Sequence, residues 1–408
     1  MRTDSKIAIV GQGYVGLPLA VLTSNAGYFT IGIDTDQVKV MALKSGKSYI
    51  EDVGDAHIQE AIASGRYQPS SDYSLIAGAD IVVFCLPTPV DTENQPDLSI
   101  LLDAVNKAAP YIREGCVVIS ESTSYPGTLR NLIATVIKSH GKNGVHLGVA
   151  PERVDPANTS FMPNQIPRLV SGLDSEATER LRQFYESLGM TVIMTSTPEV
   201  AEAAKLLENT FRQVNIALVN EFAKVATALD IDVREVIEAA ATKPYGFMKF
   251  SPGPGVGGHC IPVDPHYLTW ISKKHGFEAS LVELANEIND EMPKYVVSRF
   301  VELFPDGVAR KHILIAGIAY KYGVSDFRES PALKIISLLN DMGAHVSWYD
   351  LLIKEHRGEN SSNLESAYDG VVVTLPKLEL PLVRWVSSGV RVFDCTGFYR
   401  DIGGIYQL

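Results

Sequence analysis

Short apolar runs alternate with helical stretches through the first half of the chain. The candidate buried strands are Lys6–Val10, Phe29–Asp34, Asp80–Leu86, Cys116–Ser120, His146–Ala150 and Thr191–Thr195. Most of these runs are apolar throughout rather than alternating, which is typical of strands covered on both faces. Helical composition between them, as at Leu17–Ala26, predicts a parallel sheet with helices on both sides.

The pattern changes at Thr197, where one long amphipathic helix is predicted to run to Ala228 without a glycine. Helical patterns continue to about Phe304 and are interrupted by the glycine- and proline-rich segment Lys243–Pro265. A second α/β pattern then begins. Its predicted strands are His312–Ala316, His345–Tyr349, Gly370–Thr374 and Arg391–Asp394, with a helix at Pro331–Met342.

The predicted fold class is therefore α/β, with two doubly wound, Rossmann-like domains joined by a long central helix and a helical middle domain. The expected boundaries are 1–197, 198–304 and 305–408. A chain of 408 residues is long enough for two or three hydrophobic cores.

The net charge of −12 argues against a general nucleic-acid binder, although a few placed Arg and Lys side chains can still hold a pyrophosphate. No apolar run approaches the roughly 20 residues that span a bilayer, so no membrane partner is expected. The chain runs almost directly into its first strand, without the pattern of a signal peptide. We expect a cytoplasmic protein.

Three of the four cysteines, Cys85, Cys116 and Cys395, lie in or beside apolar runs and are expected to be buried thiols. Cys260 differs, because it follows the glycine-rich sequence Gly255–His259 and is followed four residues later by Asp264. A metal site at His259 and Cys260 is not expected, since no further Cys or His stands at a suitable spacing.

A glycine motif joins the first predicted strand to the first helix. Gly11, Gly13 and Gly16 fit the pattern G-x-G-x-x-G, and Asp34 ends the next strand. The first glycine makes the turn, the second admits a pyrophosphate and the third allows helix and strand to pack closely. Asp34 would bind a ribose and repel a 2′-phosphate, so the motif predicts NAD rather than NADP.

The long helix carries Lys205, Asn209 and Arg212 at spacings of four and three residues, which places them on one face. On an exposed helix this would be an ordinary solvated stripe, and that alternative remains open. The loop Ser251–Pro265 offers Cys260 at a turn or helix start, which would lower the thiol pKa. His259 as its partner base is a further alternative, although adjacent side chains usually point apart.

Several separated stretches resemble the UDP-glucose/GDP-mannose dehydrogenase family, and within it the branch acting on UDP-N-acetylhexosamines. They are Gly11–Ala20, Pro87–Pro89, Glu121–Thr128, Pro151–Pro156, Ala204–Glu221, Lys243–Phe250, Pro252–Pro265 and Tyr320–Lys334. The resemblance implies a four-electron oxidation of the sugar C6 alcohol to a carboxylate, with Cys260 forming a thiohemiacetal and then a thioester.

The resemblance also implies roles for other residues. Lys205 and Asn209 are similar to a pair that stabilises charge on the C6 oxygen. Thr123, Glu152 and Asp264 match positions that hold water or move protons, with Glu152 the first choice as base. The remaining cofactor contacts implied are Tyr14, Val15, Thr88, Thr123 and Arg328, and the substrate contacts implied are Arg212, Lys249, Gly253, Gly257 and Lys321.

By the same resemblance, residues 1–197 bind NAD, residues 198–304 form the interface of a homodimer or higher homo-oligomer, and residues 305–408 bind the UDP-sugar. UDP-GlcNAc is the first expected substrate, with UDP-GalNAc, UDP-ManNAc and UDP-glucose as alternatives, and the product would feed polysaccharide synthesis. A two-electron β-hydroxyacid-type dehydrogenase or a silent nucleotide-sugar-binding subunit would not require Cys260.

Overall fold

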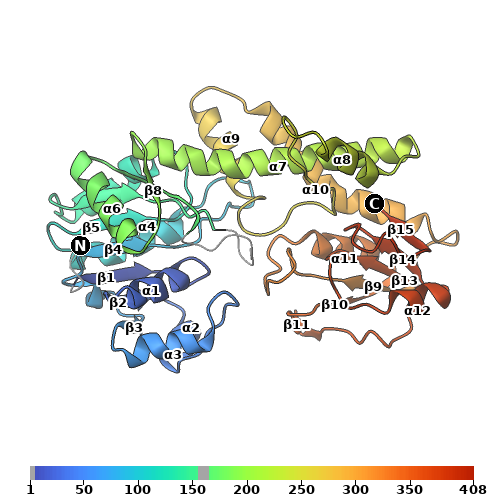
Figure 1. Ribbon diagram of the computed structural model, residues 1–408, viewed down its shortest axis with the longest axis horizontal. Coiled ribbons are helices and arrows are strands. Elements are labelled where there is room, and N and C mark those ends of the chain that lie inside the picture. The colour runs from blue at the N-terminus through green and yellow to red at the C-terminus, as the bar shows by residue number, and fades with distance from the viewer. Residues whose placement is uncertain (1–4, 155–164) are drawn as a thin grey trace. The chain divides into compact units, whose positions relative to one another are not determined.

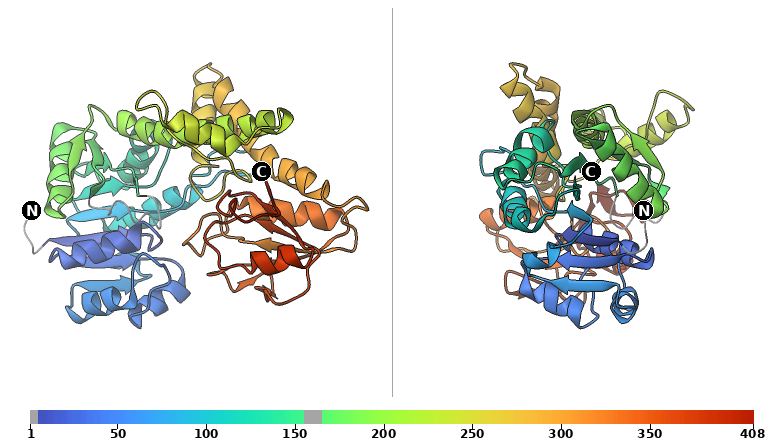
Figure 2. Two further views of the ribbon diagram at one scale, coloured as in Figure 1. Left: turned by 45° about the vertical axis from the view of Figure 1, so that its right-hand side comes forward. Right: turned by 90° about the vertical axis from the view of Figure 1, so that its left-hand side faces the viewer.

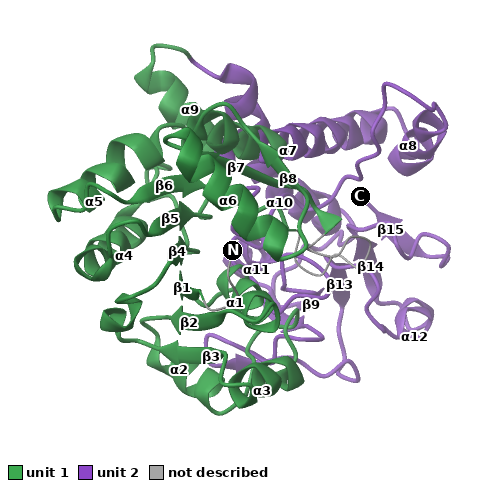
Figure 3. Cartoon of the chain, turned by 60° about the vertical axis from the view of Figure 1, so that its left-hand side comes forward, with its two compact units in different colours: residues 1–208, 266–277 green, residues 209–265, 278–408 purple. Residues whose placement is uncertain are grey.

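The computed structural model describes residues 5–154 and 165–408 (Figure 1). The chain divides into two compact units, shown in different colours in Figure 3. The first consists of Met1–Glu208 with His266–Phe277, and the second of Asn209–Pro265 with Glu278–Leu408. These two units differ from the three predicted domains, because the helical middle region contributes to both of them. The division into three domains stays a prediction.

The first unit is built on one sheet in the order β3-β2-β1-β4-β5-β6-β7-β8. The strands are β1 (Lys6–Val10), β2 (Phe29–Ile33), β3 (Tyr67–Ser70), β4 (Ile81–Phe84), β5 (Val117–Ser120), β6 (His146–Val149), β7 (Arg168–Gly172) and β8 (Val192–Met194). In β1, Ile7, Ala8, Ile9 and Val10 are all buried, which requires cover on both faces of the sheet.

All six strands predicted for this region are present, but two others were missed and the sheet is not purely parallel. The pairing of β6 with β7 is antiparallel, with Gly148 opposite Gly172. β7 was missed because only Leu169 and Val170 are strongly apolar in it. β3 was missed because it contains Pro69, which is tolerated here since β3 is an edge strand.

The helices of this unit pack on the sheet as the alternating pattern predicted. They are α1 (Gly16–Asn25), α2 (Gln37–Lys44), α3 (Asp55–Ala63), α4 (Ser99–Ala108), α5 (Ala134–Ser139) and α6 (Ser175–Ser187). Leu17 of α1, Ile58 of α3 and Phe184 of α6 are fully buried in one apolar cluster with Ile7 and Ile9 of β1. This cluster fixes the first turn after β1, where the glycine motif lies.

The long helix α7 runs from Pro198 to Ala228, starting one residue after the predicted position (Figures 1 and 2). Its 31 residues give a length of about 46 Å. It begins in the first unit and ends in the second. The other helices of the middle region are α8 (Val233–Ala241), α9 (Asp264–Lys274) and α10 (Ser280–Val301).

Most of α9 belongs to the first unit although it is remote in sequence from the sheet. Tyr267 is fully buried, and its hydroxyl donates to the carbonyl oxygens of Thr88 (3.0 Å) and Pro89 (3.1 Å). Trp270 packs against Tyr125, with ring centroids 4.8 Å apart and the ring planes tilted by 42°. These contacts tie α9 to the loops that follow β4 and β5.

The C-terminal sheet of the second unit has the order β10-β9-β13-β14-β15, and all its pairs are parallel. Its strands are β9 (His312–Ala316), β10 (His345–Tyr349), β13 (Gly370–Val373), β14 (Arg391–Asp394) and β15 (Ile405–Gln407), with α11 (Pro331–Asp341) and α12 (Leu382–Ser387). The four predicted strands are confirmed. The short β15 and the two-residue strands β11 (Glu355–His356) and β12 (Glu359–Asn360) were missed.

The predicted α/β class with two Rossmann-like sheets and a long central helix is confirmed. Across residues 5–154 and 165–408, no helix is both long and apolar enough to cross a membrane.

Candidate active site and cofactor site

The glycine turn after β1 has the geometry that the sequence predicted. Gly11 has a φ of +93°, and its N–H donates to the carbonyl oxygen of Ile33 at 2.7 Å. A Cβ on Gly16 would stand 1.8 Å from the carbonyl oxygen of Gly11, so any side chain is excluded there. The predicted turn and close-packing roles of these two glycines are confirmed.

Gly13 is different, because a Cβ at this position would meet no protein atom within 4 Å. Packing within the protein therefore does not require glycine at position 13. The helix that follows has Val15 at its N-cap, which supplies no side-chain cap to the first N–H groups. An uncapped helix N-terminus beside an open glycine suits the phosphates of a dinucleotide.

Asp34 follows β2 and lies beside the glycine turn. Its carboxylate accepts hydrogen bonds from the N–H groups of Gln12 (2.9 Å) and Asp36 (3.0 Å). Strand, glycine turn, helix and acidic residue thus stand in the arrangement that binds a nicotinamide dinucleotide. The residues present fit this cofactor.

Gln12 is part of the same turn and was not among the predicted site residues. Its side chain is fully buried and donates to the carbonyl oxygen of Ile9 at 2.9 Å. Its Oε1 accepts from the hydroxyl of Tyr67 at 2.8 Å, and the hydroxyl of Tyr49 donates to its carbonyl oxygen. Gln12 holds the turn in place through these bonds.

The carboxyl ends of β4 and β5 bring together two predicted cofactor residues. The Thr88 hydroxyl donates to the carbonyl oxygen of Thr123 at 2.7 Å. The Ser122 hydroxyl, beside Thr123, accepts from the Leu86 N–H at 2.9 Å. Adjacent parallel strands end at the same sheet edge, which explains why two loops far apart in sequence meet here. Contacts with the cofactor stay predictions.

Glu152, the predicted base, follows β6 and is held by several donors. Its carboxylate accepts from Arg168 at 2.7 Å and from the N–H groups of Arg153 (2.6 Å) and Val154 (2.7 Å). Burial alone would raise the pKa of Glu152, but Arg168 and these N–H groups lower it below its ordinary value. Glu152 is therefore ionised at neutral pH and, with this pKa, only weakly basic. Asp155 and Pro156 of the same sequence stretch lie outside the described residues.

On α7 the three predicted residues have different surroundings. Lys205 is buried, Asn209 is half-buried and Arg212 is exposed. A solvated stripe is thus excluded for Lys205 and remains open for Arg212. Glu202, one turn before Lys205, accepts from the N–H groups of Gly127 (2.7 Å) and Leu129 (3.0 Å).

The cysteine loop leads directly into α9. The carbonyl oxygen of Cys260 accepts from the N–H groups of Val263 (3.1 Å) and Asp264 (2.8 Å), so Cys260 stands at the start of the turn that opens the helix. Its predicted position is confirmed, and its lowered pKa stays a prediction. Cys85, Cys116 and Cys395 are buried, as expected, and burial raises the pKa of each of these thiols.

Asp264 connects the cysteine loop to the long helix. It is almost fully buried and accepts a hydrogen bond from Nδ2 of Asn209. Three residues expected to perform the chemistry, Asn209, Cys260 and Asp264, are therefore gathered by α7 and the first turn of α9. Lys205 lies one turn before Asn209 on the same helix.

The glycines of this loop serve more than one purpose. A Cβ on Gly257 would stand 2.9 Å from Cβ of Tyr320 and 3.0 Å from the carbonyl oxygen of Glu329. Glycine is thus required there by the protein's own packing, and a substrate contact stays a prediction. Gly253 has no atom within 4 Å of such a Cβ, and its N–H donates to Oδ1 of Asn220 at 2.9 Å.

Two other residues predicted to bind the cofactor or the substrate contact side chains of the protein itself. Arg328 donates from Nε to both carboxylate oxygens of Asp326 at 3.0 Å, and its NH2 group lies 3.2 Å from Nδ1 of His259. Lys249 pairs with Glu238 at 2.6 Å. Their contacts with cofactor or substrate are not tested by these distances. In the part of the chain that the structure describes, no group of three or more His, Cys, Asp or Glu side chains could hold a metal ion.

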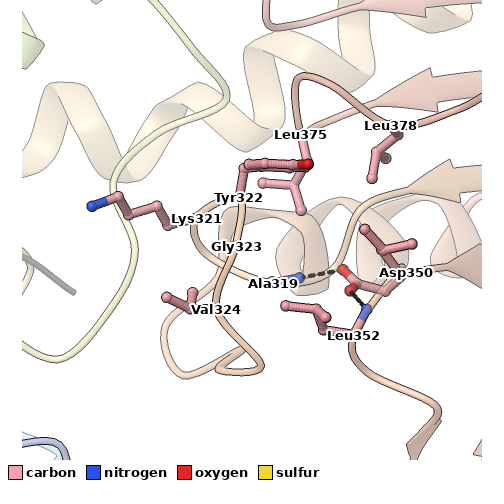
Figure 4. Close-up of a pocket in the computed structure, with 10 residues that line it drawn as sticks. Ala319, Lys321, Tyr322, Gly323, Val324, Asp350, Leu352, Leu375 and Leu378 are labelled. Carbon is pink, nitrogen blue, oxygen red and sulfur yellow. Dashed lines mark hydrogen bonds between the residues drawn. The ribbon is translucent and has the colours of Figure 1, made fainter. Parts of the chain in front are cut away.

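A small hollow lies at the carboxyl ends of β9, β10 and β13 (Figure 4). Asp350, which follows β10, accepts from the N–H groups of Ile318 (2.9 Å) and Ala319 (3.0 Å). Gly317 has a φ of +105°, so strand, glycine turn and aspartate repeat the arrangement at Gly11 and Asp34. Such a point in a parallel sheet is a common nucleotide site.

Lys321 is one of the residues lining this hollow. In Figure 4 its side chain extends away from the other lining residues. The predicted substrate residue is therefore placed at the hollow, and its contact with substrate stays a prediction.

Comparison with known families agrees with this geometry. The models of the UDP-glucose/GDP-mannose dehydrogenase family match as NAD binding domain over residues 5–189, central domain over 199–291 and UDP binding domain over 314–380. The chain belongs to this family. It is an NAD-dependent nucleotide-sugar dehydrogenase, an oxidoreductase acting on CH–OH groups.

Individual relatives carry more specific names. UDP-N-acetyl-D-mannosamine dehydrogenase of Methanococcus aeolicus is 38% identical over 86% of this chain and 79% of its own length. UDP-N-acetyl-D-glucosamine 6-dehydrogenase of Pseudomonas aeruginosa is 32% identical over 92% and 91%. Among solved structures, a UDP-D-ManNAc dehydrogenase from Pyrococcus horikoshii matches with a TM-score of 0.89 and 30% identity, covering 98% of each chain.

Proposed function

We propose that the enzyme oxidises C6 of a UDP-N-acetylhexosamine to the carboxylate through a thioester on Cys260. The observation that carries this is the joining of Asn209, Asp264 and Cys260 at the start of α9. The names of the relatives support UDP-ManNAc beside UDP-GlcNAc as the substrate, and these two differ only in configuration at C2.

NAD, when bound, accepts a hydride from C6 in each of two oxidations. After the first, the Cys260 thiolate attacks the aldehyde carbon, and the new C–S bond leaves negative charge on the C6 oxygen. The ammonium of Lys205 and the amide of Asn209 are the donors suited to stabilise that charge. The second hydride then leaves C6 and a thioester remains.

Water completes the reaction by attacking the acyl carbon, after which the C–S bond breaks and the thiolate is restored. Glu152 is the proposed acceptor of the proton from this water, because its carboxylate is ionised. Each sugar then yields one carboxylate and two NADH, with no aldehyde released.

The test is an assay of UDP-GlcNAc, UDP-ManNAc, UDP-GalNAc and UDP-glucose, measuring NADH per sugar consumed. Two NADH per UDP-N-acetylhexosamine is the expected result, and a ratio of one would overturn the four-electron reaction. Cys260→Ser should lose turnover by several orders of magnitude, because a hydroxyl is hardly ionised at neutral pH. Cys116→Ser, a buried matched control, should retain activity and change stability only.

We also propose that α7 pairs with α7 of a second copy. An exposed apolar stripe runs along it, with intervals of four and seven residues that keep it on one face. It consists of Leu207, Phe211, Leu218 and Val225, with Leu229 directly after the end of the helix, each at least 45% exposed. Such a stripe is self-complementary about a twofold axis. Leu218→Glu should convert a dimer to monomers in sedimentation, and an unchanged dimer would refute this interface.

A further inference from the structure

Arg168 lies between the buried carboxylate of Glu121 and the carboxylate of Glu152, whose side chain is 14% exposed. Its guanidinium is 2.7 Å from Glu152 and 3.6 Å from Glu121. Arg168 comes from the start of β7, Glu121 directly follows β5 and Glu152 follows β6. The Glu121 side chain is fully buried, and Arg168 is 6% exposed. The guanidinium of Arg168 thus interacts with two carboxylates in a region that is largely shielded from solvent.

Glu121 has two further neighbours that bear on its charge. The hydroxyl of Tyr185, from α6, donates to Oε1 of Glu121, and Sγ of Cys85, at the end of β4, lies 3.8 Å from Oε2. Tyr185 is fully buried and Cys85 is nearly so. With Arg168 and Glu152, these are the titratable groups that face Glu121 among residues 5–154 and 165–408.

A single guanidinium cannot fully compensate both carboxylates, because burial penalises the charge of Glu121, whose side chain is the more deeply buried. Glu152 has the shorter contact with Arg168 and also accepts two backbone N–H groups, so it keeps its charge. Burial, partly offset by Arg168, raises the pKa of Glu121 to about 7. The pair therefore changes its total charge near neutral pH, and the change falls on Glu121.

We infer that Glu121 is a positioning residue that sets the basicity of Glu152 through the guanidinium they share. While Glu121 is neutral, Arg168 compensates Glu152 alone and keeps it weakly basic. Once Glu121 ionises, Arg168 interacts with two negative charges. The charge on Glu121 then raises the pKa of Glu152 and makes it a better proton acceptor. This rests on the proposed role of Glu152 in activating water, and it makes that step faster above pH 7.

The experiment compares Glu121→Gln, Tyr185→Phe and the wild type in kcat from pH 6 to 9, with sugar and NAD saturating. Glu121→Gln should remove the rise centred near pH 7 and lower kcat at pH 8.5 several-fold. Tyr185→Phe deletes a hydrogen bond that favours the ionised carboxylate, so it should move the rise upward by about one pH unit. Tyr28→Phe deletes a hydroxyl bonded to Ser187 instead and should leave the profile unchanged.

Infrared spectroscopy of the whole enzyme measures the titration without requiring turnover. Burial also raises the pKa of Glu202 to about 7, so the spectra are compared in a Glu202→Gln background. There a protonated-carboxyl band should disappear between pH 6 and 8, and it should be absent once Glu121→Gln is added. If the band never titrates, or if Glu121→Gln keeps the wild-type pH profile, the inference is wrong even when the enzyme produces NADH. If no sugar yields NADH, the proposed function fails, whatever the band does.

Discussion

Replacing either of two glycines in the same turn by alanine is expected to impair the enzyme, but for different reasons. Gly16→Ala should lower stability, and Gly13→Ala should weaken NAD binding. In Gly16→Ala the new Cβ would stand 1.8 Å from the carbonyl oxygen of Gly11 and 3.2 Å from Cβ of Cys85. The first distance is far inside van der Waals contact with backbone that cannot rotate away. We expect the unfolding free energy to fall by about 3 kcal/mol, the upper part of the usual range for overpacking.

Gly13→Ala should leave the fold intact, because no atom lies within 4 Å of its Cβ and its φ is not in the left-handed region. Stability should stay the same or rise by about 0.5 kcal/mol, since alanine restricts the unfolded chain. The methyl group would, however, keep a pyrophosphate from approaching the backbone. Losing one charge-assisted hydrogen bond corresponds to at least a tenfold higher Kd for NAD.

Denaturant unfolding and calorimetric titration with NAD separate the two effects. Gly13→Ala should change only the Kd for NAD, with binding of UDP unaffected, whereas Gly16→Ala should lose stability first. Wild-type affinity for NAD in Gly13→Ala would show that no phosphate approaches this glycine. Wild-type stability in Gly16→Ala would show that the turn relaxes readily, and the packing argument would be wrong.

Three further predictions concern buried or binding carboxylates. Burial raises the pKa of Glu202 to about 7, so its protonated form favours the folded chain and stability is lost as pH rises from about 4.5 to 7. Denaturant unfolding at pH 5 and 8 should show the wild type losing about 3 kcal/mol more than Glu202→Gln, and equal losses would refute this. Asp350→Asn should weaken UDP binding at least tenfold, because an amide nitrogen would face backbone N–H donors, while Asp341→Asn on the exposed end of α11 should not. Asp34 should favour NAD over NADP by at least tenfold in kcat/KM, and equal use of both would show that it does not face the ribose.

The elements that the sequence predicted well are those whose patterns are local and strong. Buried runs such as Lys6–Val10 and His312–Ala316 match their strands residue for residue, and α7 differs from its prediction by one residue. β7 was missed because two apolar residues are too few to show a period. Whether such a short segment forms a strand depends on the strands that pair with it. Its antiparallel pairing with β6 is a property of the chain's path, which hydrophobic patterning does not report.

The site shows the same limit. The glycine motif and Cys260 could be recognised because the backbone or the chemistry at those positions demands a particular residue. Arg168 and Glu121 carried no such signal, since a charged residue beside an apolar run is usually exposed. Only folding brings Arg168, Glu121 and Glu152 together from three different strand ends. The packing need of Gly257 was hidden in the same way, because Tyr320 is distant in sequence.

The place of α9 has a consequence for how this enzyme could be shortened or recombined. A fragment ending after Glu208 would keep every strand of the first sheet but lose Tyr267 and Trp270. The carbonyl groups of Thr88 and Pro89 would lose their shared hydroxyl donor, and Tyr125 would lose an aromatic contact. The NAD-binding unit is thus not formed by one continuous segment of the chain. A gene fusion that exchanges this unit must include α9 as well.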